Sequence, residues 1–151
     1  MPTPDITRAS CLIPASAADI FELLATPAQH HLIDGSGSVQ GAQPRTPTRL
    51  SPGARFGMKI RIVAPYTIVN TVVEFEQGRV IAWRHFGGHV WRYRLEPVDD
   101  THTLVTEEFD PTTALSPKFL RVINAGPRNL RSIERTLDRL DQWAVRRQSA
   151  S

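Results

Sequence analysis

Three side chains in the second half of the chain carry the groups that proton transfer needs: Glu107, His85 and Tyr93. A carboxyl, an imidazole and a phenol can act as acid and base on an enolisable ring if they face the same space. Each lies in a segment where apolar and polar residues alternate, which places every second side chain of a strand on one face. We therefore treat Glu107, His85 and Tyr93 as candidate catalytic residues that converge in one cavity.

The inward face of segment 103–109 decides whether Glu107 can take part. The alternation allows either of two inward sets, of which the first ends in the bulkiest apolar residue and is the one we favour: Val105, Glu107 and Phe109, or Leu104, Thr106 and Glu108. A buried carboxyl either has a raised pKa through desolvation or pairs with a cation. An arginine of the last helix or of a neighbouring strand is therefore the competing partner for Glu107, and the Gly87-Gly88 turn is the competing partner for His85.

The same alternation predicts an apolar and aromatic wall around these groups. Tryptophan and tyrosine rings in such a wall favour flat aromatic or sterol-like ligands. The candidate ligand-binding residues are Met58, Ile60, Val73, Phe75, Trp83, Trp91, Val105, His31 and Ile123.

Metal and nucleotide chemistry lack their usual motifs. His30, His31 and Asp34 form a His/Asp cluster, but adjacent histidines on a helix point about 100° apart and no third histidine has metal-site spacing. We expect no metal, and we expect one histidine of the pair, His31, to reach the cavity mouth. GSGSVQG, at residues 35–41, fails the GxGxxG spacing and indicates a turn. No GxSxG or P-loop motif occurs, and we predict no cofactor.

These residues must be positioned by strands and short helices that the sequence also indicates. Segment 5–13 alternates and predicts a first strand; Ser16 is a plausible helix N-cap, and a short helix then runs to near Pro27. Residues 27–34 form a second short helix, and residues 41–53 form a loop with at most one short strand at 48–50. The predicted strands that follow are 55–63, 67–76, 80–86, 89–96 and 103–109, and the short turns between the last four require an antiparallel meander.

The last long segment, 127–147, predicts one amphipathic helix. Its apolar stripe is made of Leu130, Ile133, Leu137, Leu140 and Ala144, spaced three and four apart. The stripe requires a partner surface of similar length, which the strands supply. A short helical lead-in at 117–124 is expected to break before this helix, at positions 126 and 127. Separate runs of strands and helices indicate an α+β fold, with a cavity between the sheet and the long helix.

Composition places the chain among ordinary globular proteins. It has 151 residues, 40% of them hydrophobic, and a formal net charge of +3, which predicts a single domain over residues 1–151. A single cysteine, Cys11, rules out an internal disulfide framework and favours a reducing compartment. The arginines are scattered and suggest no nucleic-acid surface. Without a signal-peptide or membrane-spanning run, we expect a cytoplasmic protein with no membrane insertion.

The chain resembles the SRPBCC superfamily. The resemblance rests on ASAADIFELLATPAQHHLIDGSGSV near the start, RFGMKI, the VIAWRHF and WRYRLEPVDDTHTLVTEEFD strands and the final amphipathic helix, and it covers about residues 5–147. It is strongest to bacterial proteins of the polyketide cyclase/dehydrase-like branch; the superfamily also includes the START lipid-transfer domains and the birch-pollen allergen fold. The resemblance implies a helix-grip fold, in which a seven-stranded antiparallel sheet wraps a long C-terminal helix around a cavity for an apolar or aromatic small molecule.

Three functions fit this reading. The first is a carrier or binding protein that encloses a hydrophobic, aromatic or polycyclic small molecule. The second is a cyclase, aromatase or dehydratase that uses Glu107, His85 and Tyr93 in the same cavity. The third is a regulator that docks a protein partner through an apolar rim. Either a monomer or a homodimer is compatible with each of them.

Overall fold

The computed structural model describes residues 6–34, 39–42, 46–61, 65–85, 87–116 and 125–150. In chain order its elements are β1 (Thr7–Ile13), α1 (Ala17–Leu24), the 3-10 helix η1 (Pro27–Leu32), β2 (Val39–Ala42), β3 (Arg55–Arg61), β4 (Pro65–Glu76), β5 (Val80–His85), β6 (Val90–Asp99), β7 (His102–Asp110) and α3 (Ala125–Ala150). This is the α+β arrangement that the sequence predicts, with the meander β4 to β7 joined by short turns.

The strands form a single antiparallel sheet in the order β1-β7-β6-β5-β4-β3-β2. Six of these strands have between six and twelve residues, and β2 is a four-residue pairing at the edge. The sequence predicts a turn over GSGSVQG, of which residues 35–38 lie outside the described residues. Its end was wrong, because Val39 begins β2 and pairs with Ile60. The possible strand at 48–50 is absent, since Thr48 and Arg49 form a bend.

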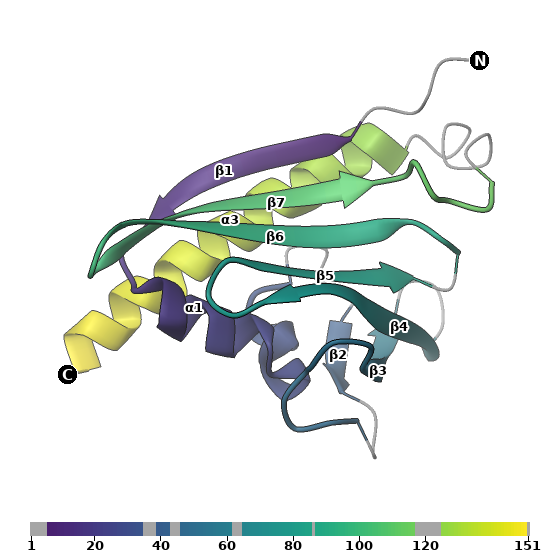
Figure 1. Cartoon of the computed structure of the whole chain (residues 1–151), viewed down its shortest axis with the longest axis horizontal. Coiled ribbons are helices and arrows are strands. Elements are labelled where there is room, and N and C mark those ends of the chain that lie inside the picture. The colour runs from purple at the N-terminus through teal and green to yellow at the C-terminus, as the bar shows by residue number, and fades with distance from the viewer. Residues whose placement is uncertain are drawn as a thin grey trace.

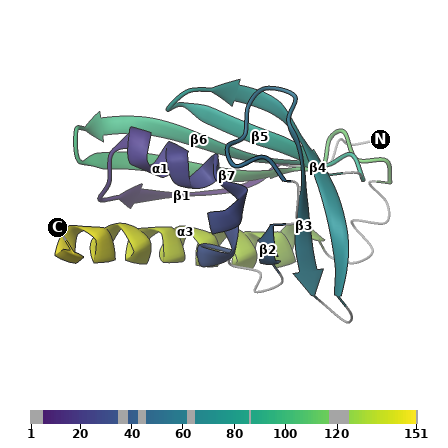
Figure 2. The ribbon, with the colours of Figure 1, turned by 90° about the horizontal axis from the view of Figure 1, so that it is seen from below.

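The helices lie on one face of this sheet, which we call the inner face (Figure 2). α3 runs beneath β1 and β7, while α1 covers the neighbouring part of the same face (Figures 1 and 2). β3 and β4 cross steeply toward the layer that holds α3. The inner face is therefore partly covered by helices and partly bounded by its own bent strands.

Local chemistry explains where the two helical elements of the first half begin. Ser16 caps α1, because its hydroxyl oxygen accepts the Asp19 N–H at 3.2 Å. Phe21 on the buried side of α1 contacts Phe75 of β4 edge-on, with ring centroids 5.2 Å apart. Pro27 begins η1, where its missing N–H costs nothing.

α3 buries the predicted apolar stripe against the sheet. Ile133, Leu137, Leu140 and Ala144 are at most 3% exposed. The helix begins at Ala125, so the predicted break at positions 126 and 127 was wrong: Pro127 lies in the first turn, where a proline is tolerated. The predicted lead-in at 117–124 lies outside the described residues. Arg139 of α3 donates to the Asp34 carbonyl oxygen at 2.9 Å and so joins the helix to the end of η1.

β4 contains an irregularity that changes which residues face inward. The pairing with β5 shifts between Val72 and Glu74, so that Val72 lies opposite Trp83 and Phe75 opposite Ile81. The extra residue, Val73, leaves the alternation out of phase on either side of it. Val72 is 2% exposed, whereas Val73 is 41% exposed, and the prediction of Val73 on the inner face is corrected. Val69, 40% exposed, also faces outward for this reason.

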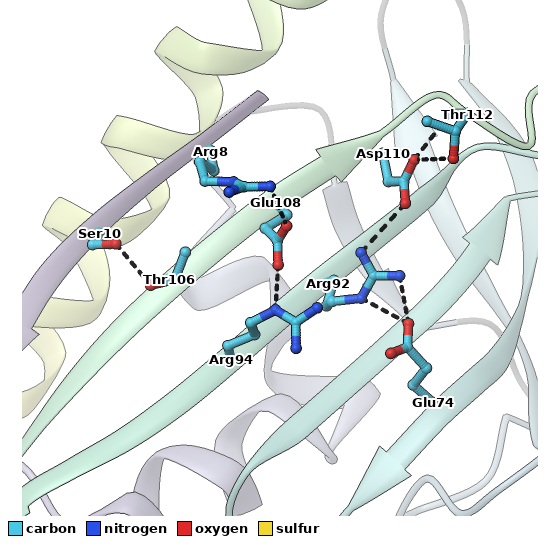
Figure 3. Close-up of polar contacts among 9 residues, drawn as sticks. All are labelled: Arg8, Ser10, Glu74, Arg92, Arg94, Thr106, Glu108, Asp110 and Thr112. Atoms are coloured by element: carbon cyan, nitrogen blue, oxygen red, sulfur yellow. Dashed lines mark hydrogen bonds and ion pairs between the residues drawn. The ribbon is translucent and has the colours of Figure 1, made fainter. Parts of the chain in front are cut away.

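Charged side chains cover the opposite, outer face of the sheet (Figure 3). They form two groups, in which each carboxylate bridges or meets guanidinium groups of neighbouring strands. The groups are Glu74-Arg92-Asp110 and Arg8-Glu108-Arg94. Glu108 is only 3% exposed beneath its two arginines, which explains how an outward carboxylate can be buried next to the inward Glu107.

Candidate functional site

The centre of the inner face contains a buried carboxyl-phenol pair. Tyr93 of β6 lies directly opposite Glu107 of β7, and its hydroxyl donates to Glu107 Oε1 at 2.9 Å. The two residues are 6% and 4% exposed. The second oxygen, Oε2, is buried and has no hydrogen-bond partner within the part of the chain that the structure describes. The sequence left an arginine as the competing partner of Glu107, and in the structure its hydrogen-bond partner is Tyr93.

Burial determines the protonation of this pair. Desolvation raises the pKa of Glu107 to about 8, because the Tyr93 hydrogen bond that stabilises its anion offsets only part of the penalty and the nearby charge of Asp34 adds to it. The pKa of Tyr93 is raised for the same reason, with the Glu107 charge as the second cause. Near neutral pH the carboxyl therefore carries a proton. Because Oε1 accepts from Tyr93, the geometry favours that proton on Oε2 as a buried donor.

Aromatic rings surround the pair on the same face. The ring centroid of Trp83 on β5 lies 5.7 Å from that of Tyr93, 5.5 Å from that of Phe56 and 5.1 Å from that of His30. The His30 ring is stacked on Trp83 with an interplanar angle of 20°. Trp83 and Trp91 are both partly buried and pack against the hydrophobic core. The polar pair therefore adjoins a continuous aromatic wall.

The histidine that enters this wall is His30, and His31 is exposed. His30 Nε2 lies 2.7 Å from the Leu24 carbonyl oxygen. Desolvation lowers the pKa of His30 to about 4, so the ring is neutral near pH 7 and Nε2 donates to that carbonyl. Pro27, His30 and Ile33 are all buried, with the spacing of three residues that stacks side chains in a 3-10 helix. That spacing was the signal that sequence reasoning missed, since it assumed α-helical geometry.

The structure places His85 apart from Glu107 and Tyr93. Tyr93 and Glu107 share a cross-strand row with Ile81, and His85 lies four residues beyond Ile81, roughly 15 Å from Glu107 by strand geometry. His85 Nδ1 accepts the Gly87 N–H at 2.9 Å, and its ring stacks on His89 at 4.4 Å. Burial lowers the pKa of His85, and it lowers that of His89 to about 4. The turn thus satisfies His85 as the alternative interpretation allowed.

The other sequence-predicted ligand residues divide into three groups. Val105 is fully buried in the core, and Phe75, Trp83 and Trp91 contact the core while partly buried. Val73 faces outward because of the irregularity in β4. Met58 and Ile60 belong to β3, but their side chains, like the whole of Ile123, lie outside what the structure describes.

Neither a metal centre nor a membrane-spanning helix is found among the described residues. No group of three His, Cys, Asp or Glu side chains there is arranged to hold a metal ion. None of the helices in those residues is long and apolar enough to cross a membrane.

Solved structures share this fold at low sequence identity. A START superfamily protein from Mycobacterium smegmatis superposes with a TM-score of 0.69 at 13% identity, covering 93% of this chain and 97% of that one. Norcoclaurine synthase from Thalictrum flavum superposes with a TM-score of 0.64 at 12% identity, covering 98% of this chain and 99% of the other. At such identities the likeness establishes the fold alone.

Sequence comparison finds a relative at higher identity than these structures. An uncharacterised protein of Mycobacterium tuberculosis is 34% identical over 147 residues, which are 93% of this chain and 65% of the relative. The chain thus spans slightly less than two thirds of the length of that curated relative. The family described as polyketide cyclase/dehydrase and lipid transport matches residues 6–144. The chain therefore belongs to this family, within the START/SRPBCC superfamily.

Proposed function

We propose that the protein binds a hydrophobic, aromatic or polycyclic small molecule on the inner face of the sheet, in a cavity beside α3. The observation that carries this proposal is the buried Glu107 Oε2, which lacks a partner among the described residues and lies beside the aromatic wall. A protonated carboxyl at this position can donate to a carbonyl or hydroxyl oxygen of a ligand, while the rings of Trp83 and Trp91 contact its apolar body.

The proposal agrees with what one structural neighbour holds. Norcoclaurine synthase from Thalictrum flavum, with a TM-score of 0.63 at 12% identity, was solved in complex with dopamine and hydroxybenzaldehyde. Both are aromatic molecules, and the second has a carbonyl group. This supports an aromatic ligand for the fold and leaves the identity of the ligand here to experiment.

A matched pair of probes tests the proposal. 2-Acetylnaphthalene and 2-ethylnaphthalene have the same ring system and nearly the same size, but only the first has a hydrogen-bond acceptor. Tryptophan fluorescence titration should show both binding, with the acetyl compound about five- to tenfold tighter, the value of one neutral hydrogen bond. Glu107→Gln should keep this preference because its amide still donates, and Glu107→Leu should lose it. Failure of both probes to bind, or equal affinity in every variant, would remove the proposal.

Native mass spectrometry of the purified protein complements this test. A co-purified apolar molecule that dissociates on denaturation would identify the chemical class directly. If the molecule remains bound in a variant such as Trp83→Asp, which places a charge in the aromatic wall, the inner face is not its site.

A second candidate is an enzyme of the cyclase or dehydratase type in the same cavity. It is favoured by the pKa of Glu107, about 8, which suits a group that gives and takes a proton near neutral pH. In that case Glu107→Gln should abolish turnover of a poly-keto substrate while ligand affinity changes by less than about tenfold. An equal loss of both would favour the binding role.

A further inference from the structure

The outer face of the sheet carries a hollow, on the opposite side from Glu107 and Tyr93. It has a volume of about 360 Å³, and its lining includes Arg55, Val69, Thr71, Arg84, Thr113 and Leu115. Volumes of this size hold small ligands. The sheet itself separates this hollow from the aromatic site proposed on the inner face.

The floor of the hollow is set by strand register. Arg55 of β3 lies opposite Thr71 of β4, and Thr71 lies opposite Arg84 of β5, so one cross-strand row reads Arg-Thr-Arg. Next along β4, Val69 lies opposite Gly57, which has no side chain to fill the space. The result is a depression flanked by two guanidinium groups.

A loop closes one side of the depression. Leu115 N–H donates to the Gly87 carbonyl at 2.8 Å, and the Thr113 hydroxyl donates to the Gly88 carbonyl. Gly88 has φ +94°, and a Cβ there would lie 2.4 Å from the Thr113 carbonyl oxygen. Only glycine permits this close approach, so Thr113 and Leu115 pack directly against the turn and form a wall of the site.

Charge distinguishes this row from the rest of the outer face. The carboxylates nearby are already engaged: Glu74 and Asp110 meet Arg92, and Glu108 meets Arg8 and Arg94 (Figure 3). Arg55 and Arg84 are exposed and have no ion pair within the described residues. Two like charges two strands apart repel unless an anion lies between them.

We propose that the hollow bounded by Arg55, Thr71, Arg84 and the Thr113–Leu115 loop binds a small amphipathic anion. Its carboxylate or phosphate group lies between the two guanidinium groups and accepts from the Thr71 hydroxyl. Its apolar part contacts Val69 and Leu115, which are 40% and 81% exposed in the free protein. Arginine suits both anions because its planar fork can donate two parallel hydrogen bonds.

Backbone amide NMR of the full chain, titrated with benzoate, phenyl phosphate and neutral benzamide, tests the proposal. The amide signals of Thr71, Arg84 and Gly88 should shift with the two anions, and comparison of their dissociation constants tells a carboxylate site from a phosphate site. Benzamide should produce no saturable shift there. Shifts confined to Trp83 and Tyr93, or equal binding of benzamide, would overturn the proposal.

Variants separate a specific site from general charge. Arg55→Gln and Arg84→Gln should each raise the dissociation constant about tenfold, the loss expected for one charge-assisted hydrogen bond. Arg131→Gln removes the same charge from the exposed face of α3 and should leave the constant unchanged. An equal loss in Arg131→Gln would mean non-specific attraction and refute the site. The amide spectrum of each variant shows directly whether it is folded.

Discussion

Replacing Glu107 by glutamine tests whether the buried carboxyl is protonated in the folded protein. The variant keeps the shape of the side chain and an acceptor for the Tyr93 hydroxyl, but it has no ionisable proton. Glu107 has a pKa of about 8 when folded against an ordinary 4.5. Between these values the unfolded chain has lost the proton and the folded chain has kept it, so stability falls as pH rises. The gap of about 3.5 between the two pKa values corresponds to a loss of at most about 5 kcal/mol in the free energy of unfolding.

Buried histidines set the pH window in which this loss can be seen. His30 and His89 have folded pKa values of about 4 against an ordinary 6.5. They are neutral when folded and charged when unfolded below pH 6.5, so their contribution is lost as pH falls and opposes that of Glu107. Above pH 6.5 the histidine contribution levels off within about one pH unit, and it cancels when wild type is compared with a Glu107 variant that keeps both histidines. From pH 6.5 to 8 the loss from Glu107 is about 1.6 kcal/mol, because the folded carboxyl is itself half ionised at pH 8.

Urea unfolding at pH 6.5, 7.25 and 8 measures this directly. Relative to Glu107→Gln, wild-type stability should fall by about 1.6 kcal/mol across the series, and the variant alone should show only the small rise that comes from the histidines. Glu108→Gln is the matched control, since it removes the adjacent carboxylate, which faces Arg8 and Arg94 on the outer side. This control should be less stable throughout yet keep the wild-type slope, because Glu107 is intact. Identical pH dependence in wild type and Glu107→Gln would refute the reasoning.

Three further predictions concern single contacts. Leu137→Ala should lower the free energy of unfolding by about 2–5 kcal/mol in urea denaturation, because Leu137 is 3% exposed within the helix stripe; a loss below about 1 kcal/mol would mean that the site relaxes fully. Gly88→Ala should lower the free energy of unfolding several times more than Gly53→Ala. The Gly53 variant should lose only about 1–2 kcal/mol from its positive φ, because nothing lies within 4 Å of a Cβ there. Equal melting points of the two variants would contradict this. Tyr93→Phe should raise the pKa of Glu107 further, because the Tyr93 hydrogen bond lowers that pKa and the variant lacks it. Carbon-13 titration of the Glu107 carboxyl measures the change, and a fall in the pKa would contradict the prediction.

The sequence was sufficient for the elements whose pattern is regular. The apolar stripe of α3, the Ser16 cap and the meander follow from local periodicity and turn chemistry, and the structure has them. Alternation also placed Glu107 and Tyr93 on one face. Their contact could be expected because consecutive strands of a meander pair with each other.

Register and strand irregularity could not be predicted from the same patterns. The residues TVVEF, 71–75, alternate plausibly in either phase, and only the pairing with β5 reveals Val73 as the extra residue. His85 shares a face with its strand neighbours, yet its separation from Glu107 depends on how far each strand slides along the next. The choice between His30 and His31 depended on a 3-10 rather than an α-helical turn.

The irregularity in β4 connects the two proposed sites. N-terminal to Val73 it turns Val72 inward beside Trp83. It leaves Thr71 on the outer face between Arg55 and Arg84, with Val69 next to it on the same face. With uninterrupted alternation in the phase of Phe75, Val69 and Thr71 would face inward, and the outer row would lose its hydroxyl. One additional residue in one strand therefore completes the inner aromatic wall and forms the floor of the outer hollow. Because both sites depend on the same strand, a ligand bound at either site should slow amide hydrogen exchange in β4.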